Sequence, residues 1–230
     1  MKLALIRHGE SETNNQNIFT GWLDPPLTQI GEQEALRAGK WIAAREIEFD
    51  RVFTSLQTRA IKSANLLLDA ADRAFLPVMK TWRLNERHYG AVQGAEKQKI
   101  ADKLGKMQVN AWRRGYVVSP PAIKHQKFDR RYQDLDPRLL PASESLADTL
   151  QRVLPVWENA IAPALKNRQN VLVVSHGNTL RALVKYLEEI PDEKINKLII
   201  YSGEMILYEI DSDLEIKAKL SKRFDRPVDQ

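Results

Sequence analysis

Two histidine–glycine pairs are the parts of this sequence whose residue types and setting can do chemistry. Arg7-His8-Gly9-Glu10 follows the apolar run Leu3–Ile6, and His176-Gly177 follows a second apolar run at 170–175. Each run has the length and continuous apolar character of a strand buried on both faces of a parallel sheet. Because ligands of open α/β sheets bind beyond the carboxyl ends of the strands, the two histidines would share one site if their strands are neighbours.

The surroundings of the two histidines favour an anionic ligand. A glycine after each histidine allows a tight turn and a close approach of backbone N–H groups to an anion. A helix predicted to start at Asn178 would add the positive end of its dipole. A single histidine after a strand is more often structural, but the chain has only four histidines and two share this setting. Metal binding is the alternative, and the absence of a His-x-x-x-His pair or an adjoining carboxylate cluster disfavours it.

The elements that must position these residues alternate between strands and helices. Further strands are predicted at 51–55, 205–210 and 214–220. Helical periodicity predicts helices at 32–47, 58–71, 145–161 and 178–189. Thr28 is the start signal of the first helix, and Ser145 to Asp148 fits a capping box. The pattern predicts an α/β three-layer sandwich, with a mainly parallel central sheet flanked by helices.

A proline, a polar stretch and the C-terminal tail interrupt this pattern of strands and helices. Pro155 lies inside a helical repeat and is expected to kink the helix or displace its start. The stretch at about 94–141 is polar, basic and rich in aromatic residues, and no linker composition marks it as an independent domain. We therefore expect a single domain, 1–230, with a lid-like excursion at about 94–141 and a short C-terminal tail at about 217–230.

Composition narrows the class of protein. With 43% hydrophobic and 28% charged residues the chain is typical of soluble globular proteins, and no apolar run is long enough for a membrane span. The net charge of +5 does not predict nucleic-acid binding, because the basic residues alternate with acidic ones and lack interleaved aromatic residues. The absence of cysteine, together with the lack of an export signal, favours a cytoplasmic protein.

The chain resembles the histidine phosphatase superfamily, also called phosphoglycerate-mutase-like, and within it the cofactor-dependent phosphoglycerate mutase branch. The resemblance is nearly collinear from residue 2 to about 210. The segments that carry it are Arg7-His8-Gly9-Glu10, Asn14, Phe19-Thr20-Gly21-Trp22, Leu27-Thr28, Thr54-Ser55, Arg59-Ala60, Leu84-Asn85-Glu86-Arg87-His88-Tyr89-Gly90, Gln93-Gly94, Trp112-Arg113-Arg114-Gly115, Glu144-Ser145-Leu146 and His176-Gly177-Asn178.

The resemblance implies a role for each candidate site residue. His8 is the candidate nucleophile, because a neutral imidazole can attack phosphorus and carry the phosphoryl group. Arg7, Arg59 and His176 would meet the charge on the transferred group, and Glu86 is the candidate general acid and base. The remaining implied ligand-binding residues are Asn14, Thr20, Gly21, Tyr89, Lys97, Arg113, Arg114, Gly177 and Asn178.

The function implied by the resemblance is an isomerase reaction of glycolysis and gluconeogenesis. It interconverts 3-phosphoglycerate and 2-phosphoglycerate through a phosphohistidine at His8, with 2,3-bisphosphoglycerate as the priming cofactor and no metal. The family also suggests a homodimer or homotetramer. A histidine-dependent phosphatase of small phosphorylated metabolites is one alternative, and a non-catalytic binding paralogue is another.

Two departures from the mutase pattern bear on that choice. The sequence Tyr201-Ser202-Gly203-Glu204 stands where the branch usually has Pro-Thr-Gly, and Glu204 would disfavour an anion if it pointed into the site. The C-terminal tail is shorter than the branch usually carries, and a lid that excludes water protects a phosphohistidine from hydrolysis. Both features concern the balance between mutase and phosphatase activity.

Overall fold

One six-stranded sheet forms the centre of the protein in the computed structural model, which describes residues 1–125 and 129–224. The strands lie in the order β3-β2-β4-β1-β5-β6. The first four of these are mutually parallel, β5 runs antiparallel to β1, and β6 antiparallel to β5. Their bounds are β1 Lys2–Arg7, β2 Arg51–Thr54, β3 Val78–Lys80, β4 Val171–Ser175, β5 Glu204–Ile210 and β6 Ile216–Arg223.

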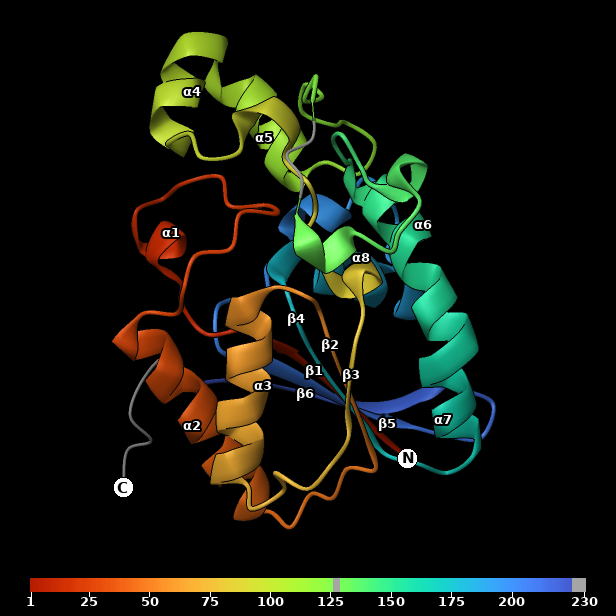
Figure 1. Ribbon diagram of the computed structural model, residues 1–230. Helices are drawn as coiled ribbons and strands as arrows, with labels where there is room; N and C mark the ends of the chain where they lie inside the picture. The colour runs from red at the N-terminus through yellow and green to blue at the C-terminus, as the bar shows by residue number, and fades with distance from the viewer. Residues whose placement is uncertain (126–128, 225–230) are drawn as a thin grey trace.

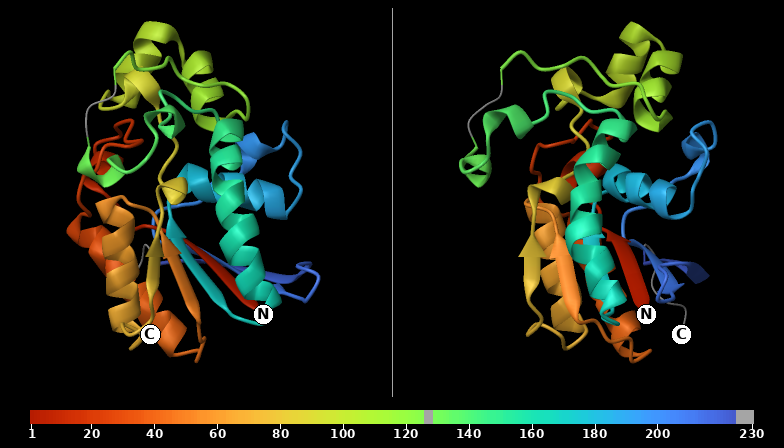
Figure 2. Two further views of the ribbon diagram at one scale, coloured as in Figure 1. Left: turned by 45° about the vertical axis from the view of Figure 1, so that its right-hand side comes forward. Right: turned by 90° about the vertical axis from the view of Figure 1, so that its right-hand side faces the viewer.

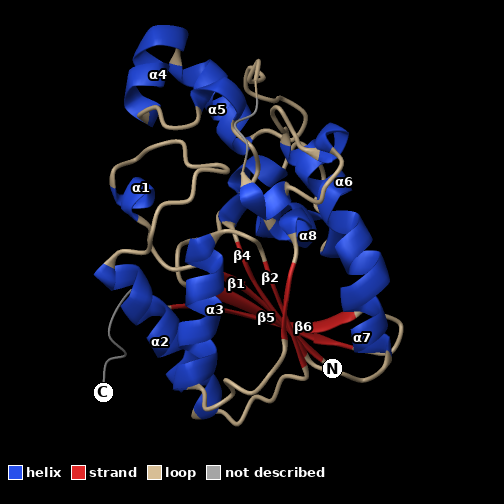
Figure 3. Cartoon of the chain, in the orientation of Figure 1, coloured by secondary structure: helices blue, strands red, loops and turns tan. Residues whose placement is uncertain are grey.

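Helices cover both faces of the sheet (Figures 1 and 3). The α-helices are α1 Glu12–Asn15, α2 Gln29–Ala43, α3 Thr58–Ala70, α4 Lys97–Leu104, α5 Lys106–Arg114, α6 Leu146–Val156, α7 Ala162–Lys166 and α8 Gly177–Leu187. Successive side chains of β1 point to opposite faces of the sheet and so belong to two separate hydrophobic cores. Leu3 and Leu5 pack with α6, α7 and α8, whereas Ala4 and Ile6 pack with α2 and α3. The predicted three-layer α/β sandwich is confirmed.

The local start signals read from the sequence are also confirmed. The Thr28 side chain accepts a hydrogen bond from the Gly31 N–H at the start of α2, and Ser145 and Asp148 form the predicted capping box of α6. Pro155 neither displaces the start of α6 nor ends the helical path. A π-helical turn at Trp157–Ile161 follows it, and α7 continues the path. No helix in the described ranges is long and apolar enough to cross a membrane.

The segment at 94–141, in the parts that the structure describes, lies beyond the carboxyl ends of the parallel strands, as the two turned views show (Figure 2). It contains α4, α5 and two short 3₁₀ turns, at Arg130–Tyr132 and Pro137–Leu139. The predicted tail needs correction, because residues up to Arg223 belong to β6, which pairs with β5 along its whole length. Phe224 is buried against Trp41, and the rest of the predicted tail, 225–230, lies outside the described residues.

Candidate active site

Parallel pairing of β1 with β4 brings the two histidine–glycine pairs together. Arg7 is in register with Ser175, so the residues that follow, His8 and His176, leave the same edge of the sheet. The His8 N–H donates to the Ser175 carbonyl oxygen at 2.9 Å, and the two imidazole centroids are 4.9 Å apart. The two histidines are therefore neighbours at the carboxyl ends of β1 and β4, as expected if these strands pair.

The hydrogen bonds of His8 define which ring nitrogen is free to react. Nδ1 lies 2.6 Å from the Gly9 carbonyl oxygen, and since a carbonyl only accepts, Nδ1 carries the proton. Nε2 therefore has the lone pair, and Nε of Arg59 donates to it at 3.3 Å. Burial, with the neighbouring guanidinium groups of Arg59 and Arg7, holds the pKa of His8 well below its ordinary value. His8 is thus a neutral imidazole whose Nε2 lies at the cavity.

His176 lies behind His8 and is fully buried. Its Nε2 is 2.8 Å from the Ser55 hydroxyl, whose oxygen also accepts from the Gln57 N–H. Within the described chain, Nδ1 of His176 is buried without a hydrogen-bond partner. Burial and then the charge of Arg59 lower the pKa of His176 well below its ordinary value, so this ring too is neutral. Of the fourteen predicted site residues, only His176 does not line the cavity described below.

Gly9 does not serve the expected close approach of backbone N–H groups to an anion. Its N–H donates to the Ser63 hydroxyl at 3.1 Å and does not face the cavity. A Cβ at position 9 would lie 2.0 Å from the Gly31 carbonyl oxygen, so glycine is needed because the backbone packs directly on the first turn of α2. Gly177 does line the cavity, and a Cβ there would lie 3.3 Å from Nε of Arg7.

Two arginines flank the His8 ring, the buried Arg59 and the half-buried Arg7. Arg59, from the first turn of α3, donates to the backbone oxygens of Leu23 at 2.8 Å and Gly21 at 3.0 Å. Arg7 donates from Nη1 to the Ile200 oxygen at 2.7 Å, and its Nε is buried without a partner among the described residues. Burial lowers the pKa of Arg59 to about 10, which keeps it a cation at neutral pH. Both groups have donors left for an anion.

Glu86 is fixed through its backbone as well as its side chain. Its N–H donates to the Gln57 amide oxygen at 2.7 Å, and its carbonyl oxygen accepts from the Trp22 indole at 2.6 Å. The carboxylate accepts from its neighbour, the Arg87 N–H, and from the Asn178 N–H at 3.2 Å. The first turn of α8 therefore donates to Glu86, so part of the predicted helix-dipole site is occupied by a carboxylate.

The segment from α1 to Gly21 forms another wall. Asn14 Oδ1 accepts from the N–H and the hydroxyl of Ser11. The Nδ2 group of Asn14 is therefore the part of its side chain that can donate to a ligand. The Thr20 hydroxyl is 2.6 Å from that of Thr13. Gly21 has φ of +53°, and a Cβ there would lie 2.1 Å from Oε1 of Gln93, so the turn requires glycine. All three predicted residues, Asn14, Thr20 and Gly21, line the cavity.

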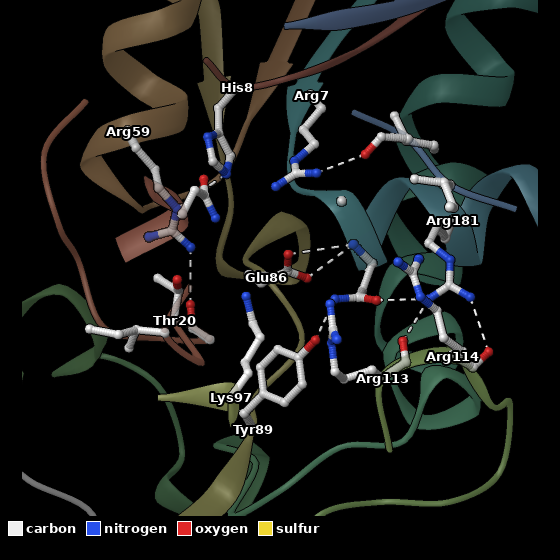
Figure 4. A pocket seen from close by; sticks show the side chains of 17 residues that line it. Arg7, His8, Thr20, Arg59, Glu86, Tyr89, Lys97, Arg113, Arg114 and Arg181 are labelled. Atoms are coloured by element: carbon white, nitrogen blue, oxygen red, sulfur yellow. Dashed lines mark hydrogen bonds between the residues drawn. The ribbon is translucent and has the colours of Figure 1, made fainter. Parts of the chain in front are cut away.

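The excursion closes the cavity with cations (Figure 4). Lys97 comes from the start of α4, and Arg113 and Arg114 from the end of α5. The Tyr89 hydroxyl accepts from Arg87 at 3.0 Å and from the Asn178 amide at 3.1 Å. Burial, and after it the charges of Arg113 and Arg7, lower the pKa of Lys97 to about 8. The volume of the cavity is about 130 Å³.

The charge balance of this cavity is strongly positive. Six cationic side chains line it, against the single carboxylate of Glu86. The cations are Arg7, Arg59, Lys97, Arg113, Arg114 and Arg181. In the part of the chain that the structure describes, no set of three His, Cys, Asp or Glu residues could hold a metal ion. The arrangement can bind a small polyanion and present a neutral histidine to it.

Sequence reasoning missed several contributors to the site. Arg181 on α8 lines the cavity, as do Ile18, Ile199 and Ile200. Arg152 on α6 is buried, pairs with Glu144 at 2.7 Å, and donates to the Arg83 oxygen at 2.7 Å in the segment before Glu86. For Arg152 the usable signal was an arginine on the apolar face of an amphipathic helix, since such a charge needs specific partners.

The altered loop does not put a carboxylate into the cavity. Glu204 begins β5, is buried, and accepts from the Tyr201 N–H at 2.7 Å, so it closes its own turn. It does not line the cavity. The other two histidines have different environments, since Nδ1 of His88 accepts from the Gly90 N–H and His125 is exposed. Burial lowers the pKa of His88 to about 4.

Comparison with known proteins identifies the family. Residues 3–220 match the model of the histidine phosphatase superfamily (branch 1), and the chain belongs to that superfamily. It is 49% identical to the 2,3-bisphosphoglycerate-dependent phosphoglycerate mutase of Lactobacillus acidophilus over 223 residues, which is 95% of this chain and 97% of that protein. It is 48% identical to 2,3-bisphosphoglycerate-dependent phosphoglycerate mutase 2 of Lactiplantibacillus plantarum over 228 residues, 96% and 99% of the two chains.

Solved structures agree on the fold. A mycobacterial glucosyl-3-phosphoglycerate phosphatase superposes with a TM-score of 0.74 at 22% identity, covering 98% of this chain and 99% of that one. The α-ribazole phosphatase of Shigella flexneri gives 0.70 at 25% identity, with all of both chains covered. The resemblance to the superfamily, and to its cofactor-dependent phosphoglycerate mutases, is confirmed.

Proposed function

We propose that this protein interconverts 3-phosphoglycerate and 2-phosphoglycerate in a 2,3-bisphosphoglycerate-dependent reaction through a phosphohistidine at His8. The observation that carries the proposal is that Lys97, Arg113 and Arg114 line the same small cavity as His8, Arg7 and Arg59. One group of cations suits the transferred phosphoryl group, and the other suits the carboxylate or second phosphate of the same molecule. The mutase relatives at 48–49% identity support it over nearly the whole chain.

The residues around His8 are suited to phosphoryl transfer. Nε2 of His8 has its lone pair at the cavity, and the Nδ1 proton is held on the Gly9 oxygen, which orients the ring for in-line attack. Arg7 and Arg59 meet the charge on the equatorial oxygens, and His176 contributes a buried ring nitrogen beside them. Asn14 adds a neutral donor.

Glu86 is suited to move the proton of the substrate hydroxyl. Its carboxylate would take that proton as the phosphoryl group leaves His8, and return it to the other oxygen as His8 takes the phosphoryl group back. Net isomerisation then requires that the bound bisphosphate reorient within the cavity between the two transfers, so that its other phosphoryl group faces His8. Thr20, Gly21, Tyr89 and Asn178 are suited to guide a small ligand through that turn.

The donor set fits the priming cofactor. Its two phosphates and carboxylate would face five of the cationic side chains that line the cavity, and Nε of Arg7 is a buried polar atom without a partner in the described ranges. When bound, 2,3-bisphosphoglycerate supplies the phosphoryl group that His8 carries into the first cycle. Arg7, Arg59, Lys97, Arg113 and Arg114 would hold it.

Further parts of the proposal concern organisation. We place the protein in the cytoplasm as a homodimer or homotetramer, and treat 1–230 as one domain whose 94–141 segment acts as a lid. The cations of that segment line the cavity, which supports the lid assignment. A histidine-dependent phosphatase remains the alternative, because the fold neighbours include phosphatases and water could replace the hydroxyl as acceptor.

One assay separates these readings. The protein is given 3-phosphoglycerate with a trace of 2,3-bisphosphoglycerate and a chelator, and both 2-phosphoglycerate and inorganic phosphate are measured. We expect isomerisation with little phosphate release, and complete loss in His8→Ala. Phosphate release without isomerisation would establish the phosphatase, loss on chelation would contradict a metal-free reaction, and turnover by His8→Ala would refute the phosphohistidine.

A further inference from the structure

Arg181 is a buried cation at the junction of three parts of the site. It lies on α8, one turn after Asn178, and only 3% of it is exposed. Figure 4 shows it beside Arg113 and Arg114, with the cavity in front of it. Nothing in the chemistry proposed above uses Arg181, although it lines the same cavity.

All five N–H groups of the Arg181 guanidinium donate to neutral oxygens of the protein. Nη1 and Nη2 reach the backbone oxygens of Arg113 at 3.2 Å and Arg114 at 3.1 Å. The other three reach the Leu198 and Ile195 oxygens at 2.9 Å and Oδ1 of Asn178 at 2.9 Å. Since a guanidinium has five N–H donors, none is left for a ligand. Arg181 therefore acts on the site through the groups that it fixes.

The two bonds to α5 fall at the point where that helix needs partners. The last carbonyls of a helix have no intrahelical donor, and a cation at this end also interacts favourably with the helix dipole. The α5 carbonyls bonded to Arg181 belong to the very residues whose side chains face the ligand cavity. Elsewhere on α5, Val109 and Trp112 pack in one apolar cluster with Phe19 and Tyr89. This packing holds the middle of the helix against the protein but does not fix the position of its C-terminal end.

The same guanidinium ties this helix end to the phosphoryl side of the cavity. Asn178, which Arg181 bonds, donates its N–H to Glu86 and its amide to Tyr89. Arg181 also bonds the 195–198 segment, and the nearby Ile200 oxygen is the acceptor of Arg7. One side chain thus links the excursion, the start of α8 and the loop that orients Arg7.

We propose that Arg181 is the positioning residue that sets the distance between the Arg113–Arg114 pair and the phosphoryl-binding core, and so selects ligands that carry a second anionic group. This inference rests on the proposed function, since it assigns those two arginines to the part of the ligand away from His8. A planar fork is required for the role, because a lysine ammonium has three donors and cannot span five separated acceptors.

The test compares Arg181→Lys, which keeps the charge but loses the fork, with Arg181→Met and the wild type. Lys62→Met is the matched control, since it removes a surface cation that pairs with Glu32 away from the cavity. Binding of 3-phosphoglycerate and of inorganic phosphate is measured by calorimetry. Hydrogen exchange of segment 106–116 is followed by mass spectrometry.

We expect Arg181→Lys to weaken 3-phosphoglycerate binding at least tenfold, to change phosphate binding less than twofold, and to speed exchange in 106–116. A lysine variant that binds 3-phosphoglycerate like the wild type would overturn the inference, because charge alone would then suffice. An equal loss of affinity for 3-phosphoglycerate and for phosphate would overturn it too, because the substitution would then act through the overall electrostatic potential or the stability of the fold.

A double-mutant cycle provides a second measurement. Arg114→Ala should weaken 3-phosphoglycerate binding at least tenfold in the wild type and less than threefold in Arg181→Lys, because the arginine is already misplaced there. Additive losses would contradict the coupling. If the wild type fails to isomerise 3-phosphoglycerate, the proposed function fails. The exchange of 106–116 still reports whether Arg181 fixes the helix end.

Discussion

Lys97 permits a quantitative test of how the cation cluster receives an anion. It is half-buried at the start of α4, and its Nζ donates to Oδ1 of Asn17 at 3.3 Å. Burial lowers its pKa to about 8, with Arg113, Arg7 and Arg114 acting in the same direction and the carboxylate of Glu86 opposing them. In the free protein this lysine is therefore charged below about pH 8 and neutral above it.

The lowered pKa of Lys97 decides how the affinity for an anion changes with pH. An anionic ligand stabilises the ammonium form of Lys97, so binding raises its pKa and takes up a proton near pH 8. If the bound lysine regains an ordinary pKa of about 10.4, the affinity at pH 9 should be roughly tenfold lower than at pH 7, or about 1.4 kcal/mol.

Calorimetric titration with 3-phosphoglycerate at pH 7, 8 and 9, in buffers of different ionisation enthalpy, measures both affinity and proton uptake. Lys97→Met is the control, and it should bind more weakly at pH 7 with little further change up to pH 9. An affinity of the wild type that is flat over this range, or a pH slope that persists in Lys97→Met, would refute the reasoning.

Three further substitutions test the structure around the site. Arg152→Met should lower the free energy of unfolding by about 3–5 kcal/mol in urea titrations, because it leaves the buried Glu144 carboxylate without its cation; a loss below about 1 kcal/mol would contradict this. Gly9→Ala should cost about 1–3 kcal/mol by the same measurement, since its Cβ would meet the Gly31 carbonyl, and an unchanged midpoint would disprove that packing. Glu204→Gln should keep kcat and KM within about twofold, because the side chain closes its own turn; a large fall in KM would instead mean that the carboxylate repels the ligand.

Most of the core could be predicted from the sequence because its signals are local. Apolar runs and helical periodicity give five of the six strands, and caps such as Thr28 give the helix starts. The strand that was missed, Val78–Lys80, has three residues and is half-buried to exposed at the sheet edge, so it has no burial pattern to detect. The π-helical turn after Pro155 depends on how the chain relieves a missing backbone donor, which periodicity does not encode.

The site divides in the same way between local and tertiary information. His8, Arg59, Glu86 and the excursion cations could be named because they stand in recognisable motifs, and all of them line the cavity. Arg181 could not, because four of its five acceptors are backbone oxygens that lie 14 to 68 positions away in the sequence. Backbone carbonyls leave no residue-specific signal, so a residue that works by holding them becomes visible only in three dimensions.

The bond between Arg59 and His8 connects ligand binding to reactivity. Nε of Arg59 donates to the lone pair of Nε2, the atom that would attack phosphorus in the proposed mechanism. A doubly charged phosphoryl group is a stronger acceptor than a neutral imidazole, so its arrival competes for the Arg59 donors and uncovers that lone pair. His8 is then most nucleophilic when the phosphoryl group is already seated. Burial, and after it the charge of Arg59, lowers the pKa of His8 and keeps the ring from taking a proton meanwhile. Arg59 thereby couples activation of the nucleophile to the presence of the group that it attacks.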